Sequence, residues 1–170
     1  MTKQLLVMRH AKSSWSDEGL TDFQRPLNKR GLRVAPQMAE FIHLQGLTPD
    51  LIVSSAASRA KMTAELFVGN CKDVGAEHLT LTKEFYHAPA EVYCEFVGRF
   101  ADESVGTLLL VGHNPGLEDL VEKLTGSWQV MPTAAIAHFD LGADSWSDID
   151  DSFKAKLKNL WRPKEIDTVR

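Results

Sequence analysis

The sequence predicts a three-layer α/β/α protein, in which helices cover both faces of a mostly parallel central sheet with one antiparallel edge strand. Short apolar runs alternate with segments of helical periodicity, as in folds built from parallel strands. Residues 107–111 are almost wholly apolar, which is typical of a strand covered on both faces. Lysines alternate with apolar residues over 154–161, and lysines discourage further pairing at a sheet edge.

The expected strands follow one another at intervals that leave room for helices between them. They are residues 5–8, 51–53, 79–82, 107–111, 135–141 and 154–161. An amphipathic helix is the alternative for the last segment. Because no repeat and no Gly/Ser-rich or Pro-rich linker divides the 170 residues, we expect a single domain spanning 1–170.

The first two helices are predicted from their capping residues. Asn28 is expected to cap a helix that runs towards Gln45 and ends at Gly46. A proline at position 36 predicts a kink or a late start in this helix. Ser58 is expected to cap a second helix, which continues through Phe67.

Two further helices are predicted in the second half of the chain. Pro89 suits the first turn of a helix that reaches position 100. Asn114 is expected to cap a helix that Pro115 opens and Gly126 closes.

Composition excludes several classes of function. The net charge of −4 argues against a general nucleic-acid binder, which usually presents a basic face. The apolar run at 5–8 is too short for a signal peptide or a membrane span, so no membrane association is expected. Cys71 and Cys94 are interpreted as free thiols in a reducing compartment, and the cytoplasm is the expected location.

Basic and imidazole side chains follow the ends of separate expected strands. Arg9 and His10 follow the first strand, Arg59 follows the second, and His113 follows the apolar strand. Ligands of open α/β sheets bind outside the carboxyl ends of the strands, so these side chains are expected to share one crevice. This set suits a phosphate, because guanidinium groups pair with phosphate oxygens and a neutral imidazole can attack phosphorus.

Each of these residues has an expected role. His10 is the candidate nucleophile and would form a phosphohistidine. Arg9 and Arg59 would stabilise charge on the phosphoryl oxygens, with Ser58 and nearby backbone N–H groups as further donors. A cation in the first turn of a helix is electrostatically unfavourable, so Arg59 is expected to face an anion. His113 would donate a hydrogen bond to a phosphoryl oxygen.

A zinc site formed by His10, His113 and a carboxylate is the competing interpretation. Two neighbouring arginines disfavour a cation there, and no close spacing of His, Cys or Asp ligands appears. No metal and no cofactor is therefore expected.

The order of these motifs resembles the histidine phosphatase superfamily, whose fold is phosphoglycerate mutase-like. The motifs that carry the resemblance are Arg9-His10-Ala11-Lys12-Ser13, residues 54–60 with Thr63-Ala64, and Val111-Gly112-His113-Asn114-Pro115. Residues 25–31 and the final Trp161-Arg162-Pro163-Lys164 are similar to its short, SixA-type phosphohistidine phosphatase branch.

The resemblance implies a role for particular residues. It implies His10 as the phosphorylated residue, with Arg9, Arg59 and His113 completing the phosphate pocket. Ser13, which ends the first motif, is assigned to the same phosphate-binding set.

Arg25 resembles an additional pocket arginine of the short branch, and a solvated loop arginine is the alternative. Ala11 stands where the family commonly has glycine. The added methyl group restricts φ there, and we expect the fold to tolerate it.

The proton donor is the least defined role. Glu84 resembles a carboxylate that larger family members use, and a solvated loop residue is the alternative. A phosphohistidine needs such an acid less, because its imidazole leaves as a neutral ring whose conjugate acid has a pKa of about 6.5. His87 is expected to have a structural role, with contact to the substrate as the alternative, whereas nothing in the sequence ties Asp22 or its loop neighbours to the reaction.

Three functions remain open. The first is a metal-independent phosphatase that acts on a protein phosphohistidine, and the short segments between motifs favour such an open cleft. The second is a phosphatase for small phosphomonoesters, and the third is a non-catalytic phosphate-binding adaptor. A mutase is disfavoured because no covering insertion would shield the phosphoryl group from water. The sequence leaves the oligomeric state open.

Overall fold

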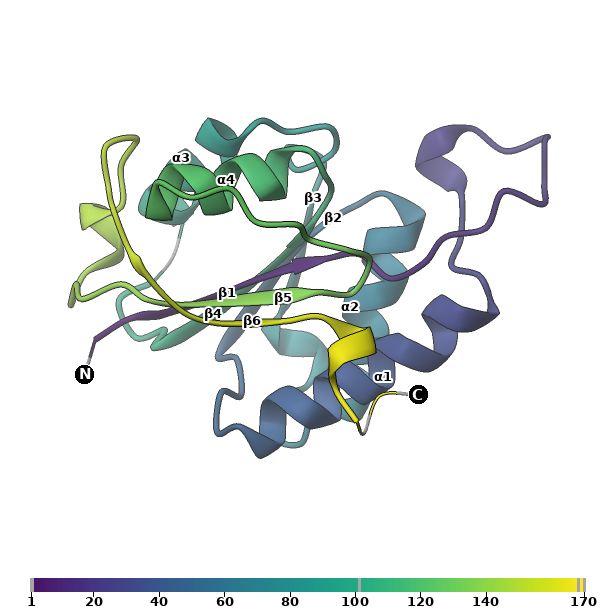
Figure 1. Cartoon of the computed structure of the whole chain (residues 1–170), viewed down its shortest axis with the longest axis horizontal. Coiled ribbons are helices and arrows are strands. Elements are labelled where there is room, and N and C mark those ends of the chain that lie inside the picture. The colour runs from purple at the N-terminus through teal and green to yellow at the C-terminus, as the bar shows by residue number, and fades with distance from the viewer. Residues whose placement is uncertain (1, 101, 168, 170) are drawn as a thin grey trace.

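The computed structural model describes residues 2–100, 102–167 and 169. A central sheet separates two pairs of helices (Figure 1). Helices α1 (Lys29–Leu44) and α2 (Ser58–Asn70) lie on one face, and α3 (Ala90–Phe100) and α4 (Gly116–Thr125) lie on the other. The predicted three-layer α/β/α architecture is confirmed.

The sheet has six strands in the order β3-β2-β4-β1-β5-β6. Their bounds are β1 Gln4–Arg9, β2 Leu51–Ser55, β3 Leu79–Thr82, β4 Thr107–Gly112, β5 Ile136–Asp140 and β6 Lys156–Trp161. The strand prediction for the last segment is confirmed, and the helical alternative is wrong.

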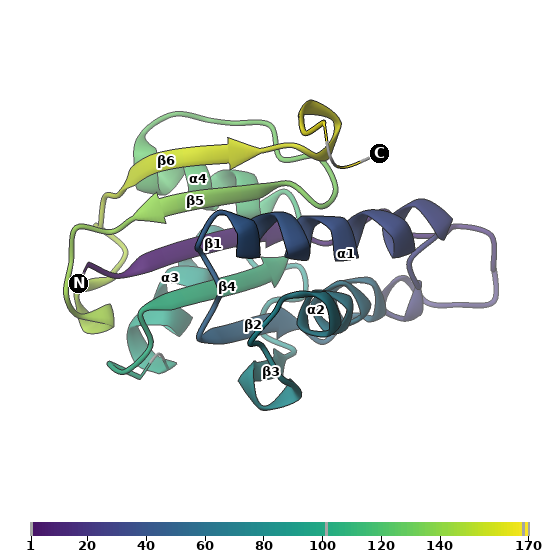
Figure 2. The same cartoon turned by 90° about the horizontal axis from the view of Figure 1, so that it is seen from below.

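One strand runs against the others. β1, β2, β3 and β4 pair in parallel, whereas β5 pairs antiparallel with both β1 and β6. The sequence predicts the single antiparallel strand at the edge, and that position is wrong: β5, which lies between β1 and β6, is reversed, whereas the edge strand β6 runs in the same direction as β1 (Figure 2). This reversal places the amino end of β5 beside the carboxyl end of β1.

The helix caps agree with the sequence in part. Asn28 Oδ1 accepts a hydrogen bond from the Gly31 N–H at 2.9 Å, as expected of a cap. Helix α1 begins at Lys29, directly after this cap, and continues through Pro36, so the predicted late start is wrong. Gly126 closes α4 in the left-handed conformation.

Two other predicted caps are wrong. Ala57 is the cap of α2 and Pro115 that of α4, each without a side-chain hydrogen bond, so Ser58 and Asn114 do not act as caps. Among the residues that the structure describes, no helix combines the length and the apolar character needed to cross a membrane.

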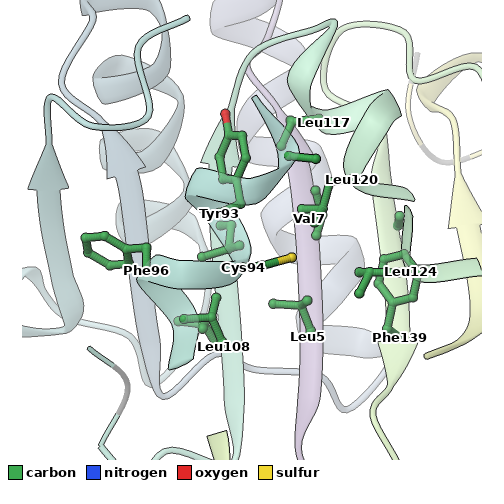
Figure 3. Packing of buried hydrophobic residues seen from close by; sticks show 14 of the residues in the cluster. Leu5, Val7, Tyr93, Cys94, Phe96, Leu108, Leu117, Leu120, Leu124 and Phe139 are labelled. Atoms are coloured by element: carbon green, nitrogen blue, oxygen red, sulfur yellow. The ribbon is translucent and has the colours of Figure 1, made fainter. Parts of the chain in front are cut away.

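Alternate side chains of β1 enter different cores. Leu5 and Val7 pack with α3 and α4 (Figure 3), whereas Leu6 and Met8 pack with α1 and α2. With both faces covered, the inner strands are rigidly held, and the residues at their ends take fixed positions. Both cysteines are free and buried, which raises the pKa of each thiol to about 11.

Candidate active site

The candidate site lies where the parallel strands β1, β2 and β4 end. In the register of the sheet, Arg9 of β1 lies opposite Gly112 of β4. The N–H of His10 continues this pairing and donates to the Gly112 carbonyl at 3.0 Å. The His10 and His113 rings consequently lie next to each other, with 5.2 Å between their centroids and 53° between their planes.

A cleft of about 210 Å³ opens at this edge. Its lining contains every residue of the predicted phosphate-binding set. The lining residues are Arg9, His10, Lys12, Ser13, Trp15, Arg25, Arg59, His87, His113, Asn114 and Thr133. The structure therefore brings together the ends of strands that are far apart in the sequence, with more than 100 positions between Arg9 and His113.

The tautomer of His10 follows from its hydrogen bonds. Nδ1 lies 2.7 Å from the carbonyl oxygen of Ala11, which can only accept, so Nδ1 carries the proton. Nε2 consequently holds a lone pair, and it accepts from Nε of Arg59 at 3.3 Å. Burial, together with Arg59 and Arg9, lowers the pKa of His10 to about 3, so the ring is neutral at physiological pH. An unprotonated Nε2 is the form that a nucleophile requires.

The two arginines of the predicted clamp differ in how they are held. Nη1 of Arg9 donates to the Met131 carbonyl at 3.1 Å, whereas its buried Nε has no partner in the described part of the chain. Burial lowers the pKa of Arg9. Since an unpaired buried donor costs about 1–3 kcal/mol, this N–H is suited to a ligand oxygen.

Arg59 is buried near the start of α2 and uses several donors within the protein. Nη1 donates to the Asp22 carbonyl at 2.7 Å, and Nη2 donates to Oδ2 of Asp22 at 3.1 Å. A guanidinium has five N–H groups, so each terminal nitrogen retains one for a ligand. The anion that balances this cation at the helix N-terminus is therefore Asp22, which the sequence did not indicate.

His113 is held by a serine that sequence reasoning missed. Its Nε2 lies 2.8 Å from Oγ of Ser55, the last residue of β2. Its buried Nδ1 has no partner among the described residues. Burial lowers the pKa of His113 to about 3. When the Ser55 hydroxyl donates to Nε2, Nδ1 carries a proton that a phosphoryl oxygen can accept. The position of Ser55 at a strand end was the available signal.

Arg25 and Ser13 form the wall of the cleft nearest the loop between β1 and α1. Nη2 of Arg25 donates to Oγ of Ser13 at 2.6 Å, and its Nε donates to the Ser14 carbonyl at 3.0 Å. Trp15 covers the guanidinium, whose Cζ lies 3.2 Å from the ring centroid. Arg25 is buried, so it is not the solvated loop arginine of the alternative interpretation.

Asp22 is the second group that the sequence did not indicate. Its carboxylate accepts from Arg25 at 2.8 Å and from the Tyr86 hydroxyl at 2.7 Å, in addition to Arg59. These contacts, led by the Tyr86 hydroxyl, hold the pKa of Asp22 well below its usual range. Asp22 is therefore an anionic anchor and is unsuited to donating a proton.

Glu84 does not join the site. Its carboxylate pairs with Arg99 at 2.9 Å on the exposed surface, and it is absent from the lining of the cleft. The geometry therefore gives no support to Glu84 as proton donor, because the loop after β3 directs it towards α3. His87 does line the cleft, and its Nε2 lies 3.6 Å from Oδ2 of Asp22.

Ala11 is fixed by α2 and fits without strain. Its N–H donates to Oγ1 of Thr63 at 3.0 Å, and that hydroxyl donates to the Arg59 carbonyl at 2.7 Å. Ala11 is fully buried, and the non-glycine residues with positive φ in the described chain lie elsewhere. The alanine in place of glycine is thus accommodated.

The geometry of these side chains does not suit a metal ion. Across the described residues, no three His, Cys, Asp or Glu side chains lie close enough together to share a metal ion. His10 and His113 instead face guanidinium groups and a serine hydroxyl.

Comparisons with known proteins agree with this geometry. The family model described as the histidine phosphatase superfamily (branch 1) matches residues 5–87, which include Arg9, His10 and Arg59. A SixA protein structure from Agrobacterium tumefaciens is 26% identical, with a TM-score of 0.79, over 96% of this chain and 99% of that one.

The chain belongs to the histidine phosphatase superfamily. Its short, SixA-like form and its phosphoglycerate mutase-like fold agree with the resemblance seen in the sequence. Membership supports a phosphatase that acts on a phosphorylated substrate.

Other relatives extend the match over most of the chain. A Mycobacterium tuberculosis protein is 30% identical over 154 residues, which cover 84% of this chain and 92% of the relative. A chloroplast protein of Arabidopsis thaliana is 27% identical over 154 residues, which cover 87% of this chain and 71% of the relative. The structure of the protein histidine phosphatase SixA complexed with tungstate shares the fold, with a TM-score of 0.79 and 22% identity over 95% of this chain and 98% of that one.

Proposed function

We propose that this protein hydrolyses phosphohistidine on a protein substrate, without a metal, through a covalent phospho-His10 intermediate. One observation carries the proposal: the cleft offers a neutral imidazole and several cations, and its described lining contains no carboxylate. Such a site can attack and stabilise a phosphoryl group but holds no carboxylic acid to protonate a poor leaving group.

The first step transfers the phosphoryl group to the enzyme. The lone pair on His10 Nε2 forms a bond to phosphorus, and the bond between phosphorus and the substrate imidazole breaks. The electron pair of that bond remains on the substrate nitrogen. Because the other nitrogen of the substrate ring carries a proton, the ring leaves as neutral imidazole. Arg9, Arg59 and His113 stabilise the charge on the phosphoryl oxygens.

The second step releases phosphate. The phosphorylated His10 ring keeps its proton on Nδ1, where the Ala11 carbonyl accepts it and stabilises the positive ring. Water then attacks phosphorus, the bond to Nε2 breaks, and its electron pair returns to Nε2. The proton of the attacking water passes to phosphate or to solvent. Both leaving groups are imidazoles, so neither step requires a carboxylic acid.

A small phosphomonoester makes a different demand on the same site. An alkoxide leaving group needs a proton in the transition state, and a positioned acid contributes about 10²–10⁴-fold to such reactions. Glu84 lies outside the cleft and Asp22 is held ionised, so neither is suited to this role. The likeness to SixA supports the phosphohistidine substrate over the ester.

The test is a phosphoryl-trapping experiment followed by a substrate comparison. The protein is mixed briefly with phosphoramidate, denatured in alkali and examined by mass spectrometry. A labile phosphate on His10 is expected in the wild type, none in His10→Asn, and the wild-type level in the control His43→Gln at the end of α1. The kcat/KM for a phosphohistidine protein should exceed that for an alkyl phosphate by about 10²-fold or more.

Two results would overturn the proposal. Turnover that survives His10→Asn without an adduct would remove the covalent mechanism. An alkyl phosphate that matches or exceeds the phosphohistidine protein would favour the phosphomonoesterase.

A further inference from the structure

A second, basic pocket adjoins the catalytic cleft. It has a volume of about 410 Å³ and lies between the start of α1, the loop before β5 and the turn after β6. We call it the basic annex, and its lining residues are Lys12, Arg30, Pro132, Thr133, Arg162, Pro163, Lys164 and Glu165. Nothing in the proposed phosphoryl-transfer steps uses Arg30, Arg162 or Lys164.

The annex concentrates positive charge in a protein whose net charge is −4. Its lining holds four cationic side chains and one carboxylate, that of Glu165. Glu165 lies 3.6 Å from Nη1 of Arg162. Lys12, Arg30 and Lys164 form no ion pair with a carboxylate in the described ranges. Four cations with a single carboxylate among them repel one another, so this arrangement favours an anionic ligand.

The annex lies directly beside the cleft. Lys12 and Thr133 line both cavities, so one substrate can occupy the two together. The backbone at this junction is fixed, because the Asn28 N–H donates to the Lys12 carbonyl at 2.9 Å. A methyl group on Gly31 would lie 2.3 Å from that same carbonyl oxygen, so α1 packs directly against the junction.

The far side of the annex is fixed as well. Nε of Arg162 donates to the Val130 carbonyl at 3.0 Å, which ties the end of β6 to the loop before β5. Pro163 is buried and begins the short turn that carries Lys164. Figure 2 shows this turn at the same end of the sheet as the start of α1. The backbone segments that carry the charged groups are therefore held at fixed positions relative to His10.

We propose that the basic annex binds an acidic side chain of the protein substrate, close in that substrate to the phosphohistidine. This inference rests on the proposed function and specifies which protein substrates the site prefers. The phosphohistidine enters the cleft, and a neighbouring Asp or Glu carboxylate pairs with Arg30, Arg162 and Lys164. The charge of the annex, its position beside the cleft and the fixed backbone of its walls all support this pairing.

The experiment compares two phosphohistidine peptides that differ only in flanking charge. One carries Asp and Glu within three positions of the phosphohistidine, and the other carries Asn and Gln there. For the wild type, we expect a kcat/KM roughly threefold to tenfold higher for the acidic peptide. This is the size of effect that partly exposed ion pairs have on the free energy of binding. Raising the ionic strength from about 0.05 to 0.5 M should remove most of this ratio.

Matched variants locate the effect. Arg30→Gln and Lys164→Gln should each reduce the ratio between the peptides towards one. Arg33→Gln, which removes a cation three residues further along α1 and outside the annex, should keep the wild-type ratio. The neutral peptide is an internal reference, because a folding defect lowers activity on both peptides together.

The outcomes separate this inference from the proposed function. If the wild type hydrolyses both peptides equally, or Arg33→Gln and Arg30→Gln change the ratio alike, the annex assignment is wrong while the phosphatase assignment stands. If neither peptide is hydrolysed, the proposed function fails. If a small bisphosphate is hydrolysed better than the acidic peptide and this preference is lost in Arg30→Gln, the annex binds a second phosphate instead.

Discussion

Oδ2 of Asp22 lies 3.1 Å from Nη2 of Arg59 and accepts one of its N–H groups. Nε of the same guanidinium donates to His10. The same carboxylate accepts from Arg25 and Tyr86. Asp22 is half-buried and comes from the loop after β1, whereas Arg59 belongs to α2. This pair therefore connects the loop that follows His10, the proposed nucleophile, to the helix that carries Arg59, a proposed phosphate-binding residue.

Asp22→Asn should destabilise the unliganded protein and enhance its response to phosphate. Loss of the carboxylate leaves Arg25 and Arg59 without a shared counter-charge, and a bound phosphate then supplies one. We expect the Tm in phosphate-free buffer to fall by about 2–4 °C for each kcal/mol lost. The increase in Tm on adding phosphate should exceed that of the wild type in differential scanning calorimetry.

The matched control is Asp17→Asn in the same loop, which should leave both Tm values close to those of the wild type. An unchanged Tm in Asp22→Asn, or a smaller response to phosphate, would contradict this role for Asp22.

Ser55→Ala should slow phosphoryl transfer by disturbing His113. The hydroxyl that fixes Nε2 of His113 is lost, so Nδ1 no longer holds its proton reliably for a phosphoryl oxygen. Loss of one such donor costs about 10²–10³-fold in kcat when it acts directly, and a smaller loss of about tenfold is expected for a positioning residue.

The measurement separates kcat from KM on a phosphohistidine substrate. Ser55→Thr, which retains the hydroxyl, should recover part of kcat. Ser54→Ala is the control, because within the described part of the chain that hydroxyl donates to the Ser55 carbonyl and does not contact His113. Equal losses in Ser55→Ala and Ser55→Thr would indicate a packing defect and not a lost hydrogen bond.

Acid should destabilise the protein through its two buried imidazoles. The pKa values of His10 and His113 are about 3 in the folded state, against an ordinary value of 6.5. Between these values the unfolded chain binds more protons, so stability falls as pH decreases from 6.5 towards 3. Well above pH 6.5 both rings are neutral in either state, so this destabilisation is absent.

Urea unfolding at several pH values tests this expectation. Each imidazole contributes a slope of up to about 1.4 kcal/mol per pH unit in this window. His10→Gln and His113→Gln should each make the decline in the free energy of unfolding shallower between about pH 6 and pH 4.5. If a variant declines as steeply as the wild type, the imidazole that it lacks takes up its proton alike in the folded and the unfolded wild-type protein.

Glu84→Gln should have little effect on either class of substrate. Its carboxylate pairs with Arg99 on the surface, and an exposed ion pair contributes about 0–1 kcal/mol. We expect kcat on a phosphohistidine peptide and on an aryl phosphate to change by less than about twofold, because removing a residue outside the site leaves the transition state unaltered. A selective loss of about tenfold or more on the aryl phosphate would restore Glu84 as a proton donor.

Local patterns were sufficient to predict most of the secondary structure. The apolar run that became β4 and the lysine alternation of β6 predicted strands because burial on each face determines which residues a strand can carry. Cap residues predicted less well, since Ser58 and Asn114 lie one position from where such a cap would stand. A cap depends on the backbone angles of a single residue, which the sequence pattern does not determine.

By itself, the sequence determined the fold class, the order of its strands and helices along the chain, and the convergence of Arg9, His10, Arg59 and His113. Residue type and strand periodicity encode these features locally, and the parallel topology brings the strand ends together.

Only the tertiary structure decided the roles of Asp22, Ser55 and Glu84 and the position of the basic annex. Asp22 meets Arg59 across 37 positions, and Ser55 meets His113 across 58. Such contacts depend on how loops from distant segments pack against one another, and no local pattern records that packing.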